Sequence, residues 1–543
     1  MIDATDPASP VPGSGVDPLV YARRWTILGA LCLSLVLVVA SVSSVNVAIP
    51  TLGRELGASD TELLWIIDAY ALVFAGLLLP AGALGDRFGR KGALQLGLGS
   101  FALLSTLAAF AGGPVALIAC RALMGAAAAL IMPATLSLLA NTFPPHERGR
   151  AIAIWAGFAG AGGAIGPVLG GLLLGHFYWG AVFFVAVPIA LTALVMVTLL
   201  APSSRDAHPS PLDPIGSLLS IAGFSALLFG IIEGPELGWT DPITLVAFAV
   251  GLACFVGFVA HERRTEHPML DLAYFSKRPF SMGAFGVTFL FFSMFSMFFG
   301  LTQYLQFVKG YSPLQAGVRG LPFALTMIVV APRSVAIGGR IGTKRMVLGG
   351  VSATVVGLLL LSLSSLDTPY WRIAIALVII AAGPALSTPT LTGQILSSVP
   401  IAKSGVGSAV NDTTREVGGA MGIAVIGTVI SSVYRSRLGE ALTGLPAEVA
   451  SRAEDSAGKA FGVASELAAQ GQQQSAGELI TAVRTSFAAA FRMGMRASAG
   501  LLFVALVVLA WHFPAGSVRR SSDLSSAQPL ASSDGDGRSA PSR

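Results

Sequence analysis

Charged residues are scarce in this chain of 543 residues. Only 12% of its residues are Asp, Glu, Lys or Arg, whereas 54% are hydrophobic and the mean hydropathy is +0.74. Soluble domains carry about 25% charged residues. A water-soluble protein of this size could not bury so much apolar surface and still present a charged exterior. The composition therefore excludes a soluble enzyme and predicts an integral membrane protein with many apolar spans.

Cysteine and histidine are also rare, which excludes several kinds of chemistry. The three cysteines lie inside separate apolar runs, and the six histidines form no cluster with the spacing of metal ligands. No P-loop pattern G-x-x-x-x-G-K-[ST] occurs, so we expect no ATP hydrolysis through a P-loop. The basic residues are dispersed, so the net charge of +5 does not indicate a nucleic-acid partner. We expect no catalytic residue, no metal and no cofactor.

Apolar runs of about 18–25 residues recur fourteen times, each long enough to cross a bilayer. The first, from Trp25 to about Ile49, is too long for the apolar core of a signal peptide, which has about 7–15 residues. Backbone groups in lipid must be paired within the protein, so the spans must be helices. The predicted fold class is an all-α integral membrane protein with 14 transmembrane helices.

The basic residues predict the orientation of these helices. More than half of the 34 Lys and Arg residues fall on one side when the connecting segments are assigned alternately to the two sides of the membrane. The side rich in Lys and Arg is normally the cytoplasmic one. Because the number of spans is even, both termini lie on that side. We therefore predict a multi-pass protein of the cell membrane with both termini cytoplasmic.

An internal repeat divides the chain. The run GGAIG at 162–166 recurs as GGAMG at 418–422, and GDRFG at 85–89 recurs, weakened, as GGRIG at 338–342. Each run recurs about 255 positions later in the chain. Two six-helix halves with two helices inserted between them explain this spacing, and repeated halves with a site between them are typical of secondary transporters. The predicted division is a cytoplasmic tail at 1–24, a first half at 25–200, a linker with the inserted helices at 201–279, a second half at 280–512 and a disordered cytoplasmic tail at 513–543. Within the second half we predict a long outer loop at 434–492. This loop contains a predicted surface helix over Pro446–Ala469.

The strongest motif is the segment 82–91, GALGDRFGRK, at the inner end of the second span. Gly82 and Gly89 permit close backbone approach, and Asp86 is suited to the N-terminus of a neighbouring helix. A positive-inside stop signal would explain Arg87 and Arg90, but not the acid or the glycine spacing. On this motif the chain resembles the major facilitator superfamily, whose pattern G-x-L-x-D-R-x-G-R-[KR] it matches at every fixed position. The resemblance implies a gating latch between the two halves.

A second motif lies in the fifth span, where Gly162, Gly166, Pro167 and Gly170 follow the form of the antiporter motif of the same superfamily. Glycines allow close helix packing, and a proline removes a backbone hydrogen bond and bends the helix. An ordinary packing face of small residues is the alternative interpretation. In the repeat the proline is replaced by Ile423, so the bend is confined to one half. The resemblance implies export rather than import.

Further residues narrow the resemblance to the fourteen-helix drug:proton antiporters of the superfamily. They are the run NVAIP, which begins at Asn46, and the pattern W-x-x-x-A-Y-x-L, which ends at Leu72. That family often has an acid five positions before the Asn of the first span, where this chain has Ser41. Proton coupling must therefore use other acids or be absent.

Few charges remain at membrane depth, where charges are costly and tend to be functional. Asp68 in the second span is the first candidate for the proton site, and a merely hydrated acid near the outer interface is the alternative. Arg121 in the fourth span matches the arginine that the family links to proton transfer. The alternative is that its side chain only extends to the outer surface of the membrane. Asp412 and Glu416 complete the proton-coupling candidates, although with Arg415 they form an i, i+3, i+4 cluster that can be an internally neutralised ion pair.

The predicted substrate cavity lies between the halves and is open to small molecules. Arg333 belongs to it only if its side chain faces inward rather than toward the membrane surface. Such a charge would favour anionic or neutral substrates over dications. The candidate cavity residues are Ser41, Asn46, Tyr70, Asn411, Arg415 and Arg333.

We therefore predict a transporter, not an enzyme, that exports small amphipathic compounds such as drugs or antibiotics in exchange for protons. Its expected partners are the small-molecule substrate, protons and the lipid bilayer, and the expected assembly is a monomer. One alternative is a dedicated exporter of one endogenous metabolite, lipid or siderophore. Another, suggested only by the long outer loop, is a receptor or scaffold that transports nothing.

Overall fold

The computed structural model describes residues 17–58, 60–204, 213–439, 453 and 457–514, and these residues form helices and no strand. Three short segments are 3-10 helices, η1 (Leu272–Ser276), η3 (Ala331–Arg333) and η4 (Ile401–Lys403), and one is a π-helix, η2 (Tyr304–Val308). The α-helices are α1 (Pro18–Leu56), α2 (Asp60–Phe88), α3 (Arg90–Ala109), α4 (Pro114–Thr142), α5 (Pro145–Leu174), α6 (Ala181–Phe184), α7 (Ala186–Leu200), α8 (Pro214–Leu237), α9 (Pro242–Glu262), α10 (Arg278–Gln303), α11 (Pro313–Val318), α12 (Leu321–Val330), α13 (Ser334–Ile341), α14 (Thr343–Leu361), α15 (Tyr370–Ser397), α16 (Ser404–Gly439), α18 (Ala457–Ala469) and α19 (Gln473–His512).

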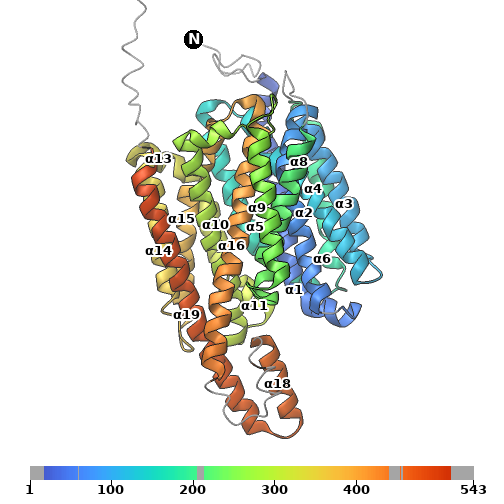
Figure 1. Cartoon of the computed structure of the whole chain (residues 1–543), viewed down its shortest axis with the longest axis vertical. Helices are drawn as coiled ribbons and strands as arrows, with labels where there is room; N and C mark the ends of the chain where they lie inside the picture. The colour runs from blue at the N-terminus through green and yellow to red at the C-terminus, as the bar shows by residue number, and fades with distance from the viewer. Residues whose placement is uncertain (1–16, 59, 205–212, 440–452, 454–456, 515–543) are drawn as a thin grey trace, which may run out of the picture.

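Within these residues, 14 helical segments are long and apolar enough to cross a membrane, which confirms the predicted number. They run side by side along the long axis of the molecule, and α1 begins at the end of the bundle at which α19 finishes (Figure 1). Three of the spans begin with the same local signal, an aspartate followed by a proline. Asp17, Asp213 and Asp241 each accept a hydrogen bond from a backbone N–H of the first helical turn. The proline has no N–H to leave unpaired there.

The apolar side chains form two large buried clusters. One runs from Ile27 to Ala201 and also takes in Leu396. The other runs from Phe258 to Phe513 and also takes in Leu79. Each part of the chain therefore has its own core, as two separately packed halves require.

The repeated glycine run makes the same kind of contact in both parts. A Cβ on Gly166 of α5 would lie 2.5 Å from the Ala40 carbonyl oxygen of α1, and a Cβ on Gly422 of α16 would lie 2.2 Å from the Phe292 carbonyl oxygen of α10. Helices pack this closely only where the contact residue has no side chain. The repeat thus encodes one backbone contact twice, α1 with α5 and α10 with α16.

The two inserted helices, α8 and α9, pack on each other beside the seam between the halves (Figure 1). Helix α8 contacts both α2 and α16. A Cβ on Gly76 of α2 would lie 2.8 Å from the Ser225 hydroxyl of α8, so α2 and α8 approach closely. On the other side, the indole nitrogen of Trp239 donates to the Thr428 hydroxyl of α16 at 3.1 Å.

Much of the segment predicted as a long outer loop, 434–492, is helical. Helix α16 continues to Gly439, α19 already begins at Gln473, and α18 packs against α19 between them. The predicted surface helix over Pro446–Ala469 is described only from Ala457 onward and at residue 453; the rest lies outside the described residues. The same holds for 1–16 of the predicted N-terminal tail and for 515–543 of the C-terminal tail, whereas α1 begins at Pro18, before the predicted Trp25.

Replacing Gly422 by Ala is expected to destabilise the protein, because the added methyl group meets the Phe292 carbonyl of the rigid helix α10. Overpacking of this kind costs about 1–3 kcal/mol. The measurement is the thermal stability of the full-length protein in detergent. Gly99→Ala in α3 is the matched control, since nothing lies within 4 Å of its Cβ position. Equal melting temperatures for the two variants would contradict the proposed contact.

Candidate functional site

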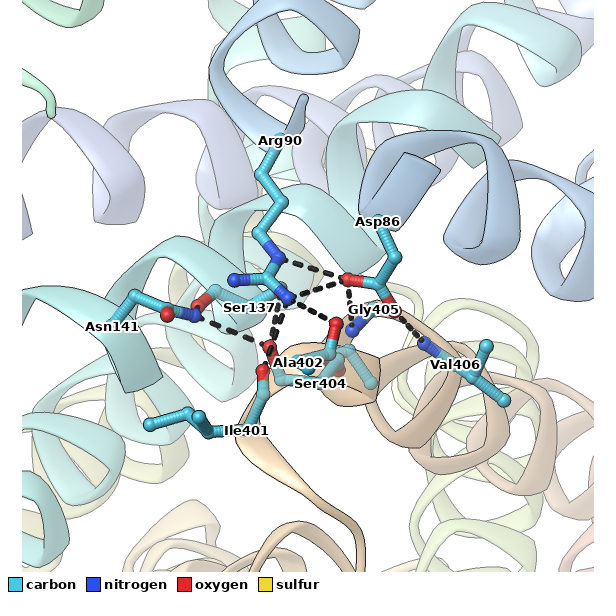
Figure 2. Close-up of polar contacts among 10 residues, drawn as sticks. Asp86, Arg90, Ser137, Asn141, Ile401, Ala402, Ser404, Gly405 and Val406 are labelled. Carbon is cyan, nitrogen blue, oxygen red and sulfur yellow. Dashed lines mark hydrogen bonds and ion pairs between the residues drawn. The ribbon is translucent and has the colours of Figure 1, made fainter. Parts of the chain in front are cut away.

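Asp86, at the end of α2, binds the first turn of α16. Its Oδ1 accepts a hydrogen bond from the Gly405 N–H at 2.9 Å, and its Oδ2 accepts one from the Val406 N–H at 3.1 Å (Figure 2). The carboxylate is buried. An anion in this position satisfies unpaired N–H groups and interacts favourably with the positive end of the helix dipole. The contact therefore joins the two halves at the end of the bundle where α2 finishes.

Arg90 completes this contact. Its Nε donates to Asp86 Oδ1 at 2.8 Å, and its Nη2 donates to the carbonyl oxygens of Ile401 at 3.0 Å and Ala402 at 2.7 Å (Figure 2). The residue is only 2% exposed. A buried carboxylate and a buried guanidinium are tolerated together because each is paired and hydrogen-bonded. We call Asp86, Arg90 and their partners at 401–406 the latch.

The other residues of the motif surround the latch, and only some of them contact the second half. Gly82 permits the approach, since its Cβ would lie 2.6 Å from the Gly405 carbonyl oxygen. Gly89 has φ +116° in the turn before α3, a conformation that side chains disfavour. The Arg87 guanidinium stacks on the neighbouring Phe88 ring, 5.5 Å from its centroid, and Lys91 binds carbonyls within its own half.

Helix α4 adds two latch contacts that the sequence motif did not indicate. The hydroxyls of Ser137 and Ser404 lie 2.7 Å apart, and the Asn141 amide donates to the Ser404 hydroxyl at 3.2 Å (Figure 2). Single Ser and Asn residues in a span have no pattern that would reveal a partner more than 250 positions away.

The antiporter motif fixes α5 against α1. Gly162 and Gly170 approach Val39 and the Ser44 carbonyl, each with a Cβ position 3.0 Å from the nearest atom. Pro167, which lies between these two glycines in the sequence, contacts the second half instead. A Cβ on Gly317 of α11 would be 3.2 Å from the proline ring. The halves therefore also touch at the end of α5 opposite the latch.

Arg121 of α4 points into the bundle and is fully buried. Its Nε donates to the Ile66 carbonyl of α2 at 2.9 Å, and its guanidinium carbon lies 4.4 Å from the centroid of the Tyr70 ring. Neither Nη atom, nor the Tyr70 hydroxyl, has a hydrogen-bond partner. The alternative that this arginine reaches the outer surface does not hold in this structure, because its side chain is enclosed between α2 and α4.

The predicted charge cluster on α16 forms one connected group. Arg415 Nη1 lies 3.4 Å from Asp412 Oδ1, which also accepts a hydrogen bond from the Asn411 amide at 3.2 Å. Asn411 in turn accepts a hydrogen bond from the Thr392 hydroxyl of α15 at 2.8 Å. Glu416 is partly buried and close enough to Tyr70 of α2 to act on it electrostatically. Asp412 and Arg415 therefore form an ion pair, and Glu416 brings the cluster close to the first half.

A narrow cavity lies between the halves, next to this cluster. It has room for about one water molecule. The second half supplies Arg415, the Thr388 hydroxyl and apolar side chains of α10, α12 and α15. Helix α5 of the first half supplies Trp155, Ala156, Ala159 and Gly160.

Asp68 does not join this group. Ile66 and Tyr70, which contact Arg121, are each two residues away, and two residues turn a helix by about 200°. Asp68 therefore faces the other flank of α2, where Glu233 of the inserted helix α8 acts on it electrostatically. Sequence reasoning missed Glu233, because no pattern showed which helix covers that flank.

Of the predicted cavity residues, Arg415 lines the described cavity, whereas Ser41, Tyr70, Asn411 and Arg333 are not among the described residues that line it. The Ser41 hydroxyl is partly buried and donates to the Leu37 carbonyl of its own helix at 2.7 Å. Arg333 is exposed, bonds to the Val329 carbonyl and is not among the residues that line the described cavity. Asn46 lies in α1, and its side chain is outside the described part of the chain.

Metal binding finds no support in the part of the chain that the structure describes, where no group of three or more His, Cys, Asp or Glu side chains can hold a metal ion.

The family model described as Major Facilitator Superfamily matches residues 31–423 of the chain. This chain belongs to that superfamily. It is 36% identical to the multidrug efflux pump LfrA of Mycolicibacterium smegmatis over 86% of this chain and 91% of that one. It is 32% identical to the methyl viologen resistance protein SmvA of Salmonella typhimurium over 92% of this chain and all of that one.

The superfamily fold is also found in solved structures. A human organic anion transporter (TETRAN) aligns with a TM-score of 0.56 and 15% identity over 89% of this chain and 98% of its own. A proton:xylose symporter aligns with a TM-score of 0.58 and 13% identity over 93% of this chain and 98% of its own. At such identities these structures bear on the fold alone.

Replacing Asp86 by Asn is expected to loosen the latch in this transporter, because the first turn of α16 loses its anionic partner. A charge at a helix N-terminus contributes up to about 2 kcal/mol when partly buried, which is about a 30-fold change in an equilibrium. The measurement is the rate at which a cysteine placed at Ser137 is alkylated, in a background without Cys32, Cys120 and Cys254. The expected result is faster alkylation in nanodiscs.

Lys91→Gln is the control, since the Lys91 ammonium binds the Thr198 and Ala201 carbonyls of its own half. The latch interpretation is wrong if Lys91→Gln raises the alkylation rate as much as Asp86→Asn does.

Proposed function

We propose that this chain exports small amphipathic drugs or antibiotics across the cell membrane in exchange for protons. The names of its relatives support export, since LfrA is a multidrug efflux pump and another relative, 34% identical over 78% of this chain, is a tetracenomycin C resistance and export protein of Streptomyces glaucescens. The observation that carries the proposal is a set of buried polar groups from both halves, Arg121 with Tyr70 and the cluster on α16, beside a cavity between the halves, with the latch closed at one end. A site between two halves that close alternately is the physical requirement of alternating access.

In this proposal residues 25–200 and 280–512 move as two units, and α8 and α9 are additions between them. The latch lies on the cytoplasmic side with both termini, as the distribution of Lys and Arg favours. With the latch closed, the structure corresponds to a state sealed toward the cytoplasm. The protein works as a monomer, because the cavity takes side chains from both halves of one chain.

We propose that Glu416 and Asp412 of α16, together with Arg121 of α4, carry the proton coupling. Arg121 has unpaired buried nitrogens and packs on Tyr70, and Glu416 of α16 acts electrostatically on the same Tyr70. A deprotonated Glu416 therefore interacts with Tyr70 across the boundary between the halves, whereas a protonated one carries no charge to do so. Proton binding thus changes the interaction between the halves, which is what coupling requires.

Asp68 is the second candidate for the proton site. Its neighbour Glu233 is another acid. Two carboxyl groups that are close together in a poorly hydrated place tend to share a proton. The two candidates lie on opposite flanks of α2, so substitutions separate them.

A susceptibility screen tests the export function. Cells that express the gene are expected to tolerate several chemically unrelated compounds better than cells that lack it, because a permissive cavity accepts many amphipathic shapes. A change for no drug would contradict drug export and favour the dedicated export of one metabolite, lipid or siderophore.

Coupling is tested with Glu416→Gln in inverted vesicles, using a substrate found in that screen. Substrate uptake driven by a pH gradient is expected to fall to the level of vesicles without the protein, while expression is retained. Glu416→Asp, which keeps the titratable group, is expected to retain part of the transport. If Glu416→Gln transports normally and Asp68→Asn does not, the coupling runs through Asp68 instead.

A further inference from the structure

Two residues that line the cavity between the halves each carry a buried hydrogen-bond donor without a partner. Arg415 and Thr388 are each 5% exposed, and both line the cavity. Neither the Nε of Arg415 nor the hydroxyl of Thr388 has a hydrogen-bond partner. An unpaired buried polar atom costs about 1–3 kcal/mol, so a ligand that supplies an acceptor here recovers that cost.

Aromatic rings fix the direction of the arginine. Its guanidinium carbon lies 4.5 Å from the centroid of the Phe291 ring and 5.5 Å from that of Trp155. Trp155 is completely buried and donates from its indole nitrogen to the Thr135 hydroxyl at 3.2 Å, so its ring is held in place. The lining of the cavity thus contains one aromatic side chain from each half, and both lie close to the guanidinium.

The charge in this cavity has one sign. Among the described residues that line it, Arg415 is the charged one. Asp412 does not line the cavity; its Oδ1 is engaged by Arg415 and Asn411, and its Oδ2 has no hydrogen-bond partner. Glu416, one position further along α16, faces Tyr70 rather than the cavity.

We propose that this cavity recognises planar aromatic compounds that carry an acceptor oxygen, such as a carboxylate, a phenolate or a carbonyl, and disfavours cations of the same shape. The inference rests on the proposed export function and specifies the substrate class of that site. The ring of the substrate stacks between Trp155 and Phe291, and its oxygen accepts hydrogen bonds from Arg415 and Thr388. The cavity holds only about one water molecule in the closed arrangement, and it widens when α5 moves away from α10 and α16, because its walls belong to different halves.

The test is equilibrium binding to the purified full-length protein in nanodiscs, followed by the fluorescence of two probes with one ring system. Anthracene-9-carboxylate is the anion, and 9-(aminomethyl)anthracene is the cation. The anion is expected to bind the native protein at least about tenfold more tightly than the cation, the effect of one charge-assisted hydrogen bond. Equal affinities, or tighter binding of the cation, would overturn the proposal.

Variants assign this preference to the cavity. Thr388→Val is expected to weaken binding of the anion several-fold, since it removes the hydroxyl and keeps the shape. Arg415→Gln leaves Asp412 unpaired, so the double variant Asp412→Asn with Arg415→Gln is included as a neutral replacement of the whole ion pair. Arg415→Gln and the double variant are both expected to abolish the preference for the anion. Arg333→Gln is the control, because Arg333 is exposed and does not line the cavity.

If the correctly folded double variant keeps the preference for the anion, Arg415 does not recognise the ligand and the proposal is wrong. Binding and transport fail separately in this design. Selective binding that depends on Arg415, without transport of any compound, would contradict export but leave the site in place. Drug export without selective binding would support export and exclude this substrate class.

Discussion

The contact between the Asp86 carboxylate and the first turn of α16 governs the rest of the structure. It places one half's anion on the other half's helix dipole, and Arg90 ties the same carboxylate to the carbonyls that precede α16. Helix α16 also carries Asp412, Arg415 and Glu416, about two to three turns further along. Because an α-helix moves as a rigid element over such a length, release of the latch displaces the charge cluster and one wall of the cavity together. The proposed gate and the proposed binding site are thus joined through one helix.

Sequence patterns predicted the helices and the motifs better than they predicted which neighbours each side chain would face. Hydropathy predicted the 14 spans, since spanning lipid requires long apolar helices, and the motif at 82–91 predicted a latch. The partners of that latch, at 401–406 and on α4, are ordinary Ser, Gly and Ala residues without a pattern of their own. Asp68 and Arg333 show that the direction of a side chain is also hard to predict from sequence. An intramembrane charge predicts function, but which neighbour covers each flank of a helix depends on tertiary packing, and here the packing turns Asp68 toward α8 and leaves Arg333 exposed.

The inserted helices lie where the two halves must move relative to each other. Helix α8 approaches α2 closely at Gly76, whereas its described polar link to α16 is a single side-chain hydrogen bond from Trp239, just after the helix. A neutral hydrogen bond contributes about 0.5–1.5 kcal/mol net, much less than a packed helix face. The insertion is nevertheless packed against both halves, because Phe258 of α9 belongs to the core cluster of the second half and Phe224 of α8 packs against that cluster.

The internal repeat explains why the cavity is asymmetric. In both halves a glycine run packs one helix of a pair on its partner, so the repeat preserves the scaffold. The positions of α5 that correspond to Asp412, Arg415 and Glu416 are Ala156, Ala159 and Gly160, and these three small residues line the cavity opposite Arg415. Polar groups on both sides would have left two buried charge clusters competing for one space, at a high cost of desolvation. Small residues on one side leave that space open, and the guanidinium on the other side faces it. The divergence of the two halves at these positions is thus what leaves space for the proposed binding site in an otherwise symmetric scaffold.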